Sequence, residues 1–125
     1  DGYAPKHVWF GVTAENQARW DERCDAMRAI PAAVRWVSAE PLIGPVVPRP
    51  QDMCGAGGVD WVVAGGENGG GARECHAEWI ANLWLAGSVY SVPFFFKQWG
   101  KNAVRYPQYA DLESSIEKRQ EWPKA

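Results

Sequence analysis

The sequence predicts an α/β fold in which four parallel strands in βα units form half of a (β/α) barrel or a small open parallel sheet. Three segments share one pattern, an apolar run followed by two small residues and a glutamate, which is Glu15, Glu40 or Glu67. A fourth apolar run leads to Lys97, and the spacings are 25, 27 and 30 residues, about the length of one strand with its crossover. Polar groups at the C-terminal ends of such strands are typical of α/β proteins with a shared active-site rim.

The sequence predicts four strands, with a helix between the first two. Four apolar runs, rich in aromatic and β-branched residues, are the expected strands: residues 8–13, 34–39, 60–65 and 92–97. Between the first two, the segment 15–31 carries Trp20, Cys24 and Met27 at helical spacing, opposite a charged face. This amphipathic pattern predicts a helix that Pro31 ends.

The second half departs from strict alternation. Pro41 ends the second strand's regular pairing, and the stretch 44–58 is so rich in proline and glycine that we expect an irregular loop. The segment 76–87 has one apolar helical face and is expected to end at Gly87. We divide the chain into a half-barrel domain, residues 1–100, and a polar tail, residues 101–125, with a short helix.

Composition excludes several classes of function. The 125 residues suffice for one domain with a core. The net charge of −2 and the lack of a basic stripe argue against tight nucleic-acid binding. No stretch reads as a membrane span or a signal peptide, so we expect a cytoplasmic protein. The three cysteines are scattered without CxxC spacing, so we expect no metal site on them.

The strand-end residues are the candidate catalytic group, namely Glu15, Glu40 and Lys97. Neighbouring strands lie about 4.8 Å apart, so the glutamates that end them are expected to converge. Converging carboxylates repel one another and need a cation, which is either Lys97 or a divalent metal ion. The alternative is that each glutamate caps a helix or faces water.

A glycine-rich run follows the third strand and is the candidate cofactor-binding loop. Its backbone amides can approach a ligand closely or form an anion-binding nest, although glycines also make tight turns. The run has neither the Walker spacing nor GxGxxG, and Arg73 just beyond it can pair with Glu67 or hold an anionic ligand. The candidate cofactor-binding residues are Gly65, Gly66, Glu67, Asn68 and Arg73.

The segment FFFKQWG offers a charge, an amide and a flat ring in consecutive positions. Strand alternation would place Lys97 and Trp99 on one side and Gln98 on the other. We expect Lys97 and Trp99 to face the rim, where Trp99 can stack on a planar ligand.

The segments VWFGVTAENQ, PAAVRWVSAEPLIGP, DWVVAGGENGGGAR with CHAEW, and VPFFFKQWG closely resemble the C-terminal half of a phage and prophage protein family of unknown function. The resemblance runs from about His7 to Gly100. In that family an N-terminal half carries a cysteine cluster like that of radical S-adenosylmethionine enzymes, and the whole resembles their barrel. None of the cysteines here matches that motif, so the resemblance implies that this chain does not bind the iron–sulfur cluster. Asn68 stands where relatives usually have serine.

The resemblance implies a C-terminal module that is not active alone. Glu67 and its glycines would hold S-adenosylmethionine, Glu15, Glu40 and Lys97 would orient a substrate, and the substrate contacts would be Asn16, Gln98 and Trp99. Two alternatives stay open: a divalent-metal-dependent hydrolase or isomerase site on the carboxylates, and a non-enzymatic interaction module. The expected partners are a second copy, a separate N-terminal half, or a host or phage protein.

Overall fold

The computed structural model describes residues 6–124 and contains a four-stranded parallel sheet in the order β1-β2-β3-β5. Its strands are β1 (Trp9–Thr13), β2 (Val34–Ala39), β3 (Trp61–Ala64) and β5 (Phe94–Phe96). All neighbouring pairs are parallel, and the register places Gly11 beside Trp36 and Trp36 beside Trp61. The predicted α/β class with four parallel strands is therefore confirmed, and the described strands form an open sheet, not a closed barrel.

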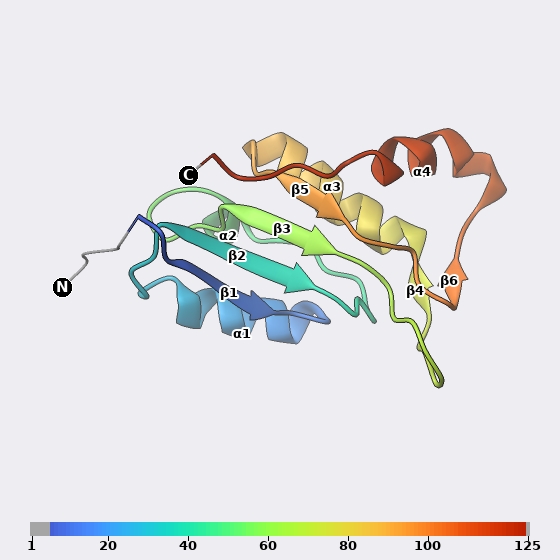
Figure 1. The fold of residues 1–125 in the computed structure, drawn as a ribbon, viewed down its shortest axis with the longest axis horizontal. Coiled ribbons are helices and arrows are strands. Elements are labelled where there is room, and N and C mark those ends of the chain that lie inside the picture. The colour runs from blue at the N-terminus through green and yellow to red at the C-terminus, as the bar shows by residue number, and fades with distance from the viewer. Residues whose placement is uncertain (1–5, 125) are drawn as a thin grey trace.

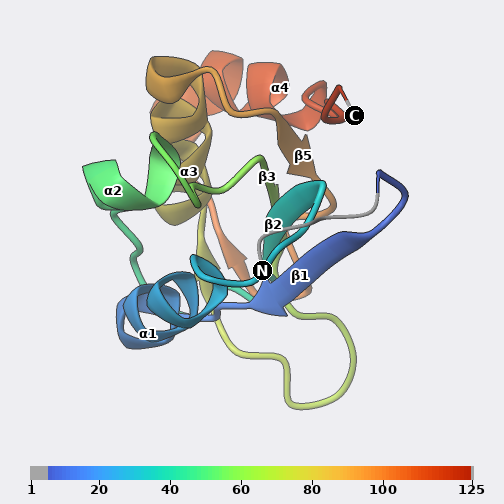
Figure 2. The ribbon, with the colours of Figure 1, turned by 90° about the vertical axis from the view of Figure 1, so that its left-hand side faces the viewer.

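The helices cover one face of this sheet (Figures 1 and 2). They are α1 (Gln17–Met27), α2 (Pro50–Met53) and α3 (Ala77–Tyr90), whereas α4 (Ala110–Glu117) packs against α3. Figure 2 shows α1, α2 and α3 on one side of the strands, while the other side carries no helix. The core lies between sheet and helices and includes these buried residues: Trp20, Met27, Val37, Leu42, Val62, Ile80, Leu83 and Phe94. We call the uncovered side of the sheet the inner face.

The predicted first helix is confirmed, because Trp20, Cys24 and Met27 are its buried residues. Asn16 caps it, since its Oδ1 accepts a hydrogen bond from the Arg19 backbone N–H at 2.9 Å. Among residues 6–124 no helix has both the length and the apolar character that crossing a membrane requires.

Two expectations about the connections are wrong. The stretch 44–58 is not entirely irregular, because α2 begins at Pro50, and proline fits the first helical turn, where its missing N–H would have no partner. Helix α3 does not end at Gly87 but continues to Tyr90 and is capped by Ser91 in a left-handed conformation. A Cβ on Gly87 would lie 2.8 Å from the Val92 carbonyl oxygen, so this glycine lets the chain that follows the helix pack closely against it.

A buried carboxylate fastens α2 to α1. Asp52 accepts a hydrogen bond from Trp20 Nε1 at 2.9 Å and from Arg49 Nη2 at 2.7 Å. It also pairs with Arg28 Nη2 at 3.3 Å. Because Asp52 and Trp20 are both buried, these contacts satisfy polar groups that water does not reach.

The C-terminal tail packs against the sheet. A two-residue parallel pair, β4 (Cys75–His76) with β6 (Ala103–Val104), precedes a 3₁₀ turn at Pro107–Tyr109 and then α4. Beyond α4, residues 119–121 run antiparallel along the outer edge of β5, with Phe96 N–H donating to Arg119 O at 2.7 Å and Glu121 N–H to Phe94 O at 3.0 Å. The tail helix expected from sequence is present as α4.

Candidate functional site

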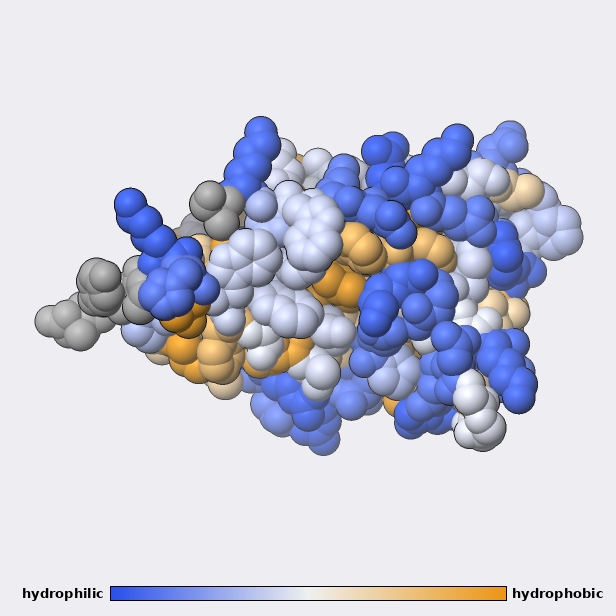
Figure 3. Space-filling view, in the orientation of Figure 1, coloured by the Kyte–Doolittle hydropathy of each residue, from blue (hydrophilic) through white to orange (hydrophobic). Residues whose placement is uncertain are grey.

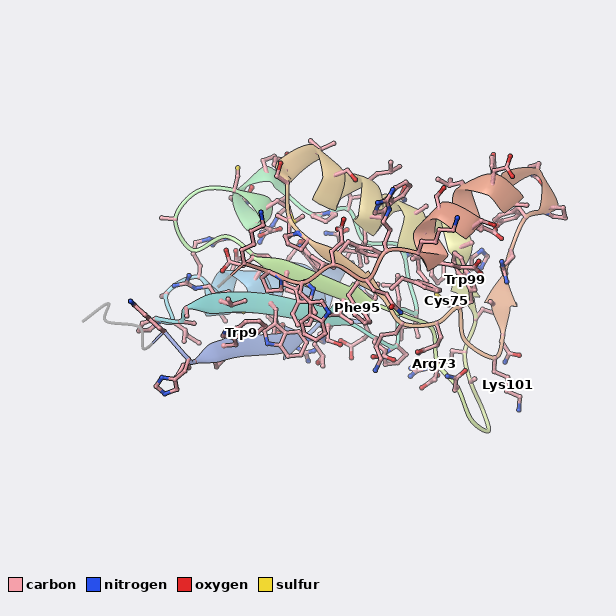
Figure 4. The ribbon with its side chains drawn as sticks, turned by 45° about the horizontal axis from the view of Figure 1, so that its top comes forward. Trp9, Arg73, Cys75, Phe95, Trp99 and Lys101 are labelled. Atoms are coloured by element: carbon pink, nitrogen blue, oxygen red, sulfur yellow. The ribbon has the colours of Figure 1, made fainter. Side chains whose placement is uncertain are left out.

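Aromatic side chains gather on the inner face of the sheet. We call Trp9, Trp36, Trp61, Phe95 and Trp122 the aromatic layer. Ring centroids lie 5.4 Å apart for Trp36 and Trp61, and 4.7 Å apart for Trp61 and Trp122. Figure 3 shows pale and apolar surface across the middle of this face, and Figure 4 places Trp9 and Phe95 on it. The layer therefore gives the uncovered sheet a continuous aromatic surface.

Strand register and one glycine make room for this layer. Side chains alternate along a strand, so level residues of neighbouring strands share a face. Gly11 is level with Trp36, and a Cβ on Gly11 would lie 2.2 Å from the Trp36 ring. The Trp36 indole thus lies across β1 where only glycine leaves space.

A hollow of about 260 Å³ opens above the aromatic layer, toward the C-terminal ends of the strands. Rings of Trp36, Trp61, Phe95 and Trp122 line its floor and sides, and Glu40 and Lys97 line its polar end. The hollow therefore combines aromatic walls with one cation and one carboxylate.

Glu40 is the centre of the polar end. Lys97 Nζ lies 3.1 Å from Glu40 Oε1, and Gln98 Nε2 donates to Glu40 Oε2 at 2.7 Å and to the Gly66 carbonyl oxygen at 2.7 Å. The side chain of Glu40 is 23 % exposed and that of Lys97 is 48 % exposed. Both Lys97 and Gln98 thus reach the rim, although strand alternation predicts that they point apart.

The other two strand-end glutamates each have an arginine of their own. Arg23 of α1 lies 3.1 Å from Glu15 Oε1 and also donates to the Thr13 carbonyl oxygen at 2.7 Å. Arg73 donates from Nε and Nη2 to the two oxygens of Glu67, both at 2.9 Å. These bonds and that of the Arg73 backbone N–H lower the pKa of Glu67 to about 2. Each of the three carboxylates thus has its own cationic side chain as a partner. A shared metal ion is therefore not needed to offset their mutual repulsion.

The first two glycines of the loop serve packing in this structure. Gly65 N–H donates to Ala39 O at 3.2 Å, and Gly66 N–H donates to Gln98 O at 2.9 Å. A Cβ on Gly66 would lie 2.0 Å from the Trp99 carbonyl oxygen, so only glycine allows the two backbones to approach this closely. Asn68, further along the loop, is exposed. The loop thus extends strand pairing and does not form an open nest at Gly65 and Gly66.

The expected orientation of Trp99 is wrong. Its side chain is 8 % exposed, and its Nε1 donates to Glu117 Oε2 at 2.6 Å on α4. Its ring lies 4.7 Å from that of Phe96 and under the guanidinium of Arg105. Because β5 ends at Phe96, strand alternation does not extend to residue 99, and Trp99 packs on the helix-covered side.

Two contributors have little or no signal in the sequence. Arg23 lies on the charged face of the first helix, where its spacing from Glu15 gives only a weak indication of a pair. Trp122 lies in the polar tail, and nothing local predicts that it reaches the inner face. Within residues 6–124, no group of three histidine, cysteine, aspartate or glutamate side chains could hold a metal ion.

A family model described as "Protein of unknown function (DUF5131)" matches residues 1–121, which include most of the tail. No curated protein and no solved structure matches the chain.

Proposed function

The chain belongs to the DUF5131 family of proteins of unknown function, and we propose that it supplies the substrate-facing wall of a partial (β/α) barrel enzyme. In this proposal a small molecule lies over the inner face. Glu40, Lys97 and Gln98 orient its polar groups at the C-terminal ends of the strands. The phage-family resemblance supports the finer proposal that the barrel works inside an infected bacterial cell.

The observation that carries this proposal is the one-sided sheet with a polar pair at its C-terminal end. Helices cover one face, as they cover the outside of a barrel. The opposite face keeps a hollow whose polar groups, Glu40 and Lys97, stand where α/β enzymes hold their reacting groups. Fold alone does not assign a reaction, so the proposal rests on this hollow and its residues.

Further βα units would complete the barrel at one sheet edge. The outer edge of β5 is occupied by residues 119–121. Within residues 6–124, the outer edge of β1 has no strand partner, so strands added to the sheet would pair there. This supports a module that works with a further half, supplied by the same polypeptide or by another.

The finer proposal, a barrel that uses S-adenosylmethionine and an iron–sulfur cluster, fits the described residues poorly. Both oxygens of Glu67 are bound by Arg73, and the amides of Gly65 and Gly66 are paired with backbone carbonyls. Cys24 and Cys75 are buried, whereas Cys54 is exposed, so cluster ligands would have to come from beyond residues 6–124. We therefore derive no step through either group.

The interaction module remains a second candidate because of one observation. Trp122 is 61 % exposed and Trp9 is also exposed, so a partner protein could cover the aromatic layer. The metal-dependent alternative has less support, since a metal ion would have to displace Arg23, Lys97 or Arg73 from the carboxylates.

Native mass spectrometry of the chain, purified without oxygen from a bacterial host, tests the proposed function. We expect the wild type to carry a small molecule, with or without a second polypeptide. Lys97→Met should lose the small molecule, because it removes the cation of the hollow and keeps the length of the side chain. Lys101→Met is the matched control, since Lys101 is an exposed lysine near Lys97 in the sequence but outside the hollow.

Two results would overturn this proposal. One is equal retention of the small molecule by Lys97→Met and by the control variant. The other is a wild-type chain that carries no small molecule, and a second polypeptide retained on its own would then favour the interaction module.

A further inference from the structure

We propose that the hollow binds a planar aromatic ring that carries an anionic group, such as an aromatic carboxylate, and that the C-terminal tail is part of this binding site. This inference rests on the proposed function, because it names the class of small molecule for the same hollow. Its two parts follow from the walls of the hollow and from the donors of Lys97.

The walls favour a flat ring. Trp36, Trp61, Phe95 and Trp122 line the hollow, and its volume of about 260 Å³ lies just below that of pockets for drug-sized ligands, so it suits a small ring system. Trp122 is 61 % exposed, so much of its ring is available to a ligand. Aromatic rings stack in offset or edge-to-face arrangements and remove large apolar areas from water. A saturated ring of equal size would bury similar area but could not stack.

The polar end favours an anion over a cation. An ammonium has three N–H donors, and Glu40 Oε1, at 3.1 Å, engages one of those of Lys97. The 48 % exposure of the Lys97 side chain leaves its ammonium accessible from the hollow. Both oxygens of Glu40 already accept hydrogen bonds or an ion pair from Lys97 and Gln98. An anionic group can therefore bind the remaining donors of Lys97, and the donors that Lys97 and Gln98 direct at Glu40 offset the repulsion from this carboxylate. A ligand cation would have to lie beside the Lys97 ammonium in order to reach Glu40.

The tail positions the Trp122 wall. Backbone hydrogen bonds join Arg119 and Glu121 to β5, and they fix the direction in which the chain leaves the edge of the sheet. Trp61 Nε1 donates to the Glu121 carbonyl oxygen at 2.8 Å, directly before Trp122. The rings of Trp61 and Trp122 then lie 4.7 Å apart at an interplanar angle of 30°. Residues 119–122 therefore belong to the site and are not an independent appendage.

Three probes separate the two parts of the proposal. 2-Naphthoate is planar and anionic, 2-naphthamide is planar and neutral, and decahydronaphthalene-2-carboxylate is anionic but not planar. Their dissociation constants are measured by ligand-observed NMR titration of the purified full chain at one fixed salt concentration. We expect 2-naphthoate to bind about tenfold more tightly than either of the other probes, because it alone engages both the rings and Lys97.

Variants locate the binding. Trp122→Ala should weaken 2-naphthoate about tenfold, and Lys97→Met should reduce its affinity to that of 2-naphthamide. Tyr109→Ala and Lys101→Met are controls, since they remove an exposed ring and an exposed cation outside the hollow. Both should bind 2-naphthoate as the wild type does, and circular dichroism should show all four variants folded.

The inference is wrong if wild type binds the three probes equally, or if Trp122→Ala binds 2-naphthoate as tightly as wild type does. Neither result bears on the proposed function, which is judged by the Lys97-dependent retention of the natural small molecule in mass spectrometry. A chain that retains such a molecule but prefers no planar anion would have the proposed site with another class of ligand.

Discussion

Replacing Asp52 with alanine should cost more stability than any other single truncation of a charged side chain in the described core. The carboxylate is buried and accepts hydrogen bonds from Trp20 Nε1 at 2.9 Å and Arg49 Nη2 at 2.7 Å. Its removal leaves the buried Trp20 N–H without an acceptor and Arg49 without its closest partner. It also weakens the junction of α2 with α1, which then depends on the bonds of Arg49 to Asp21 and Asp25.

The magnitude follows from those contacts. Removing one partner of a buried ion pair costs about 3–5 kcal/mol, because the remaining polar groups lose their compensation. For a chain of this length, that corresponds to roughly 10–20 °C in Tm. Asp52→Asn keeps the volume and one oxygen acceptor, so it should lose less, about 1–3 kcal/mol. This milder variant keeps the prediction measurable if alanine prevents folding.

Urea denaturation followed by circular dichroism measures the free energy of unfolding for each variant. Asp25→Ala is the matched control, since Asp25 also pairs with Arg49, at 2.8 Å, but is exposed. It should unfold close to the wild-type midpoint, because exposed pairs contribute little. An Asp52→Ala midpoint equal to that of Asp25→Ala would refute the conclusion that the buried carboxylate holds the two helices together.

Three further predictions concern the rim and the thiols. The Glu67 carboxyl has a pKa of about 2, below its ordinary value of 4.5, so its pairing contributes to stability above about pH 4.5 and is lost as pH falls toward 2. Arg73→Ala should return this pKa toward its ordinary value in a carboxyl-detected NMR titration, and an unchanged pKa would contradict the assigned cause. Gly66→Ala should lower Tm, because the new Cβ would lie 2.0 Å from the Trp99 carbonyl oxygen, and an unaltered melting curve would count against that close approach. Iodoacetamide at pH 8 should label exposed Cys54 first, since burial raises the pKa of Cys24 to about 12 and that of Cys75 to about 11. Mass spectrometry measures the labelling of each cysteine, and equal labelling of all three would contradict this prediction.

The parallel sheet was predictable because its signal is local and repeated. Each strand is a short apolar run, and Trp20, Cys24 and Met27 mark the buried face of the first helix by their spacing. The two-residue strands β4 and β6 were not predictable, since two residues are too few to show the alternation of apolar and polar side chains that marks a strand. Gly87 reads as a helix end in the sequence, whereas in the structure it lies within α3 and admits the Val92 backbone.

The candidate site was predictable in position and in part of its pairing, since Arg73 was expected beside Glu67 and Lys97 beside the carboxylates. The strand-end glutamates lie where the parallel topology places them, yet the partners of Glu15 and Glu40 come from a helix face and from two consecutive residues that both turn to the rim. Trp122 reaches the site because the polar residues before it form backbone hydrogen bonds with β5. Such bonds do not depend on side chains, so no pattern in the sequence predicts them. Long-range contacts of this kind determine which candidate residues come together in a site, and the sequence does not reveal them.

The antiparallel tail segment along β5 also restricts how two copies of this chain could assemble. A head-to-tail ring would need β5 of one copy beside β1 of the next, and residues 119–121 already hold that edge. Two copies could instead join β1 to β1 across a twofold axis, as isologous dimers do. Such a pair would run the two sheets in opposite directions and set its two hollows at opposite ends, so each hollow would act independently of the other.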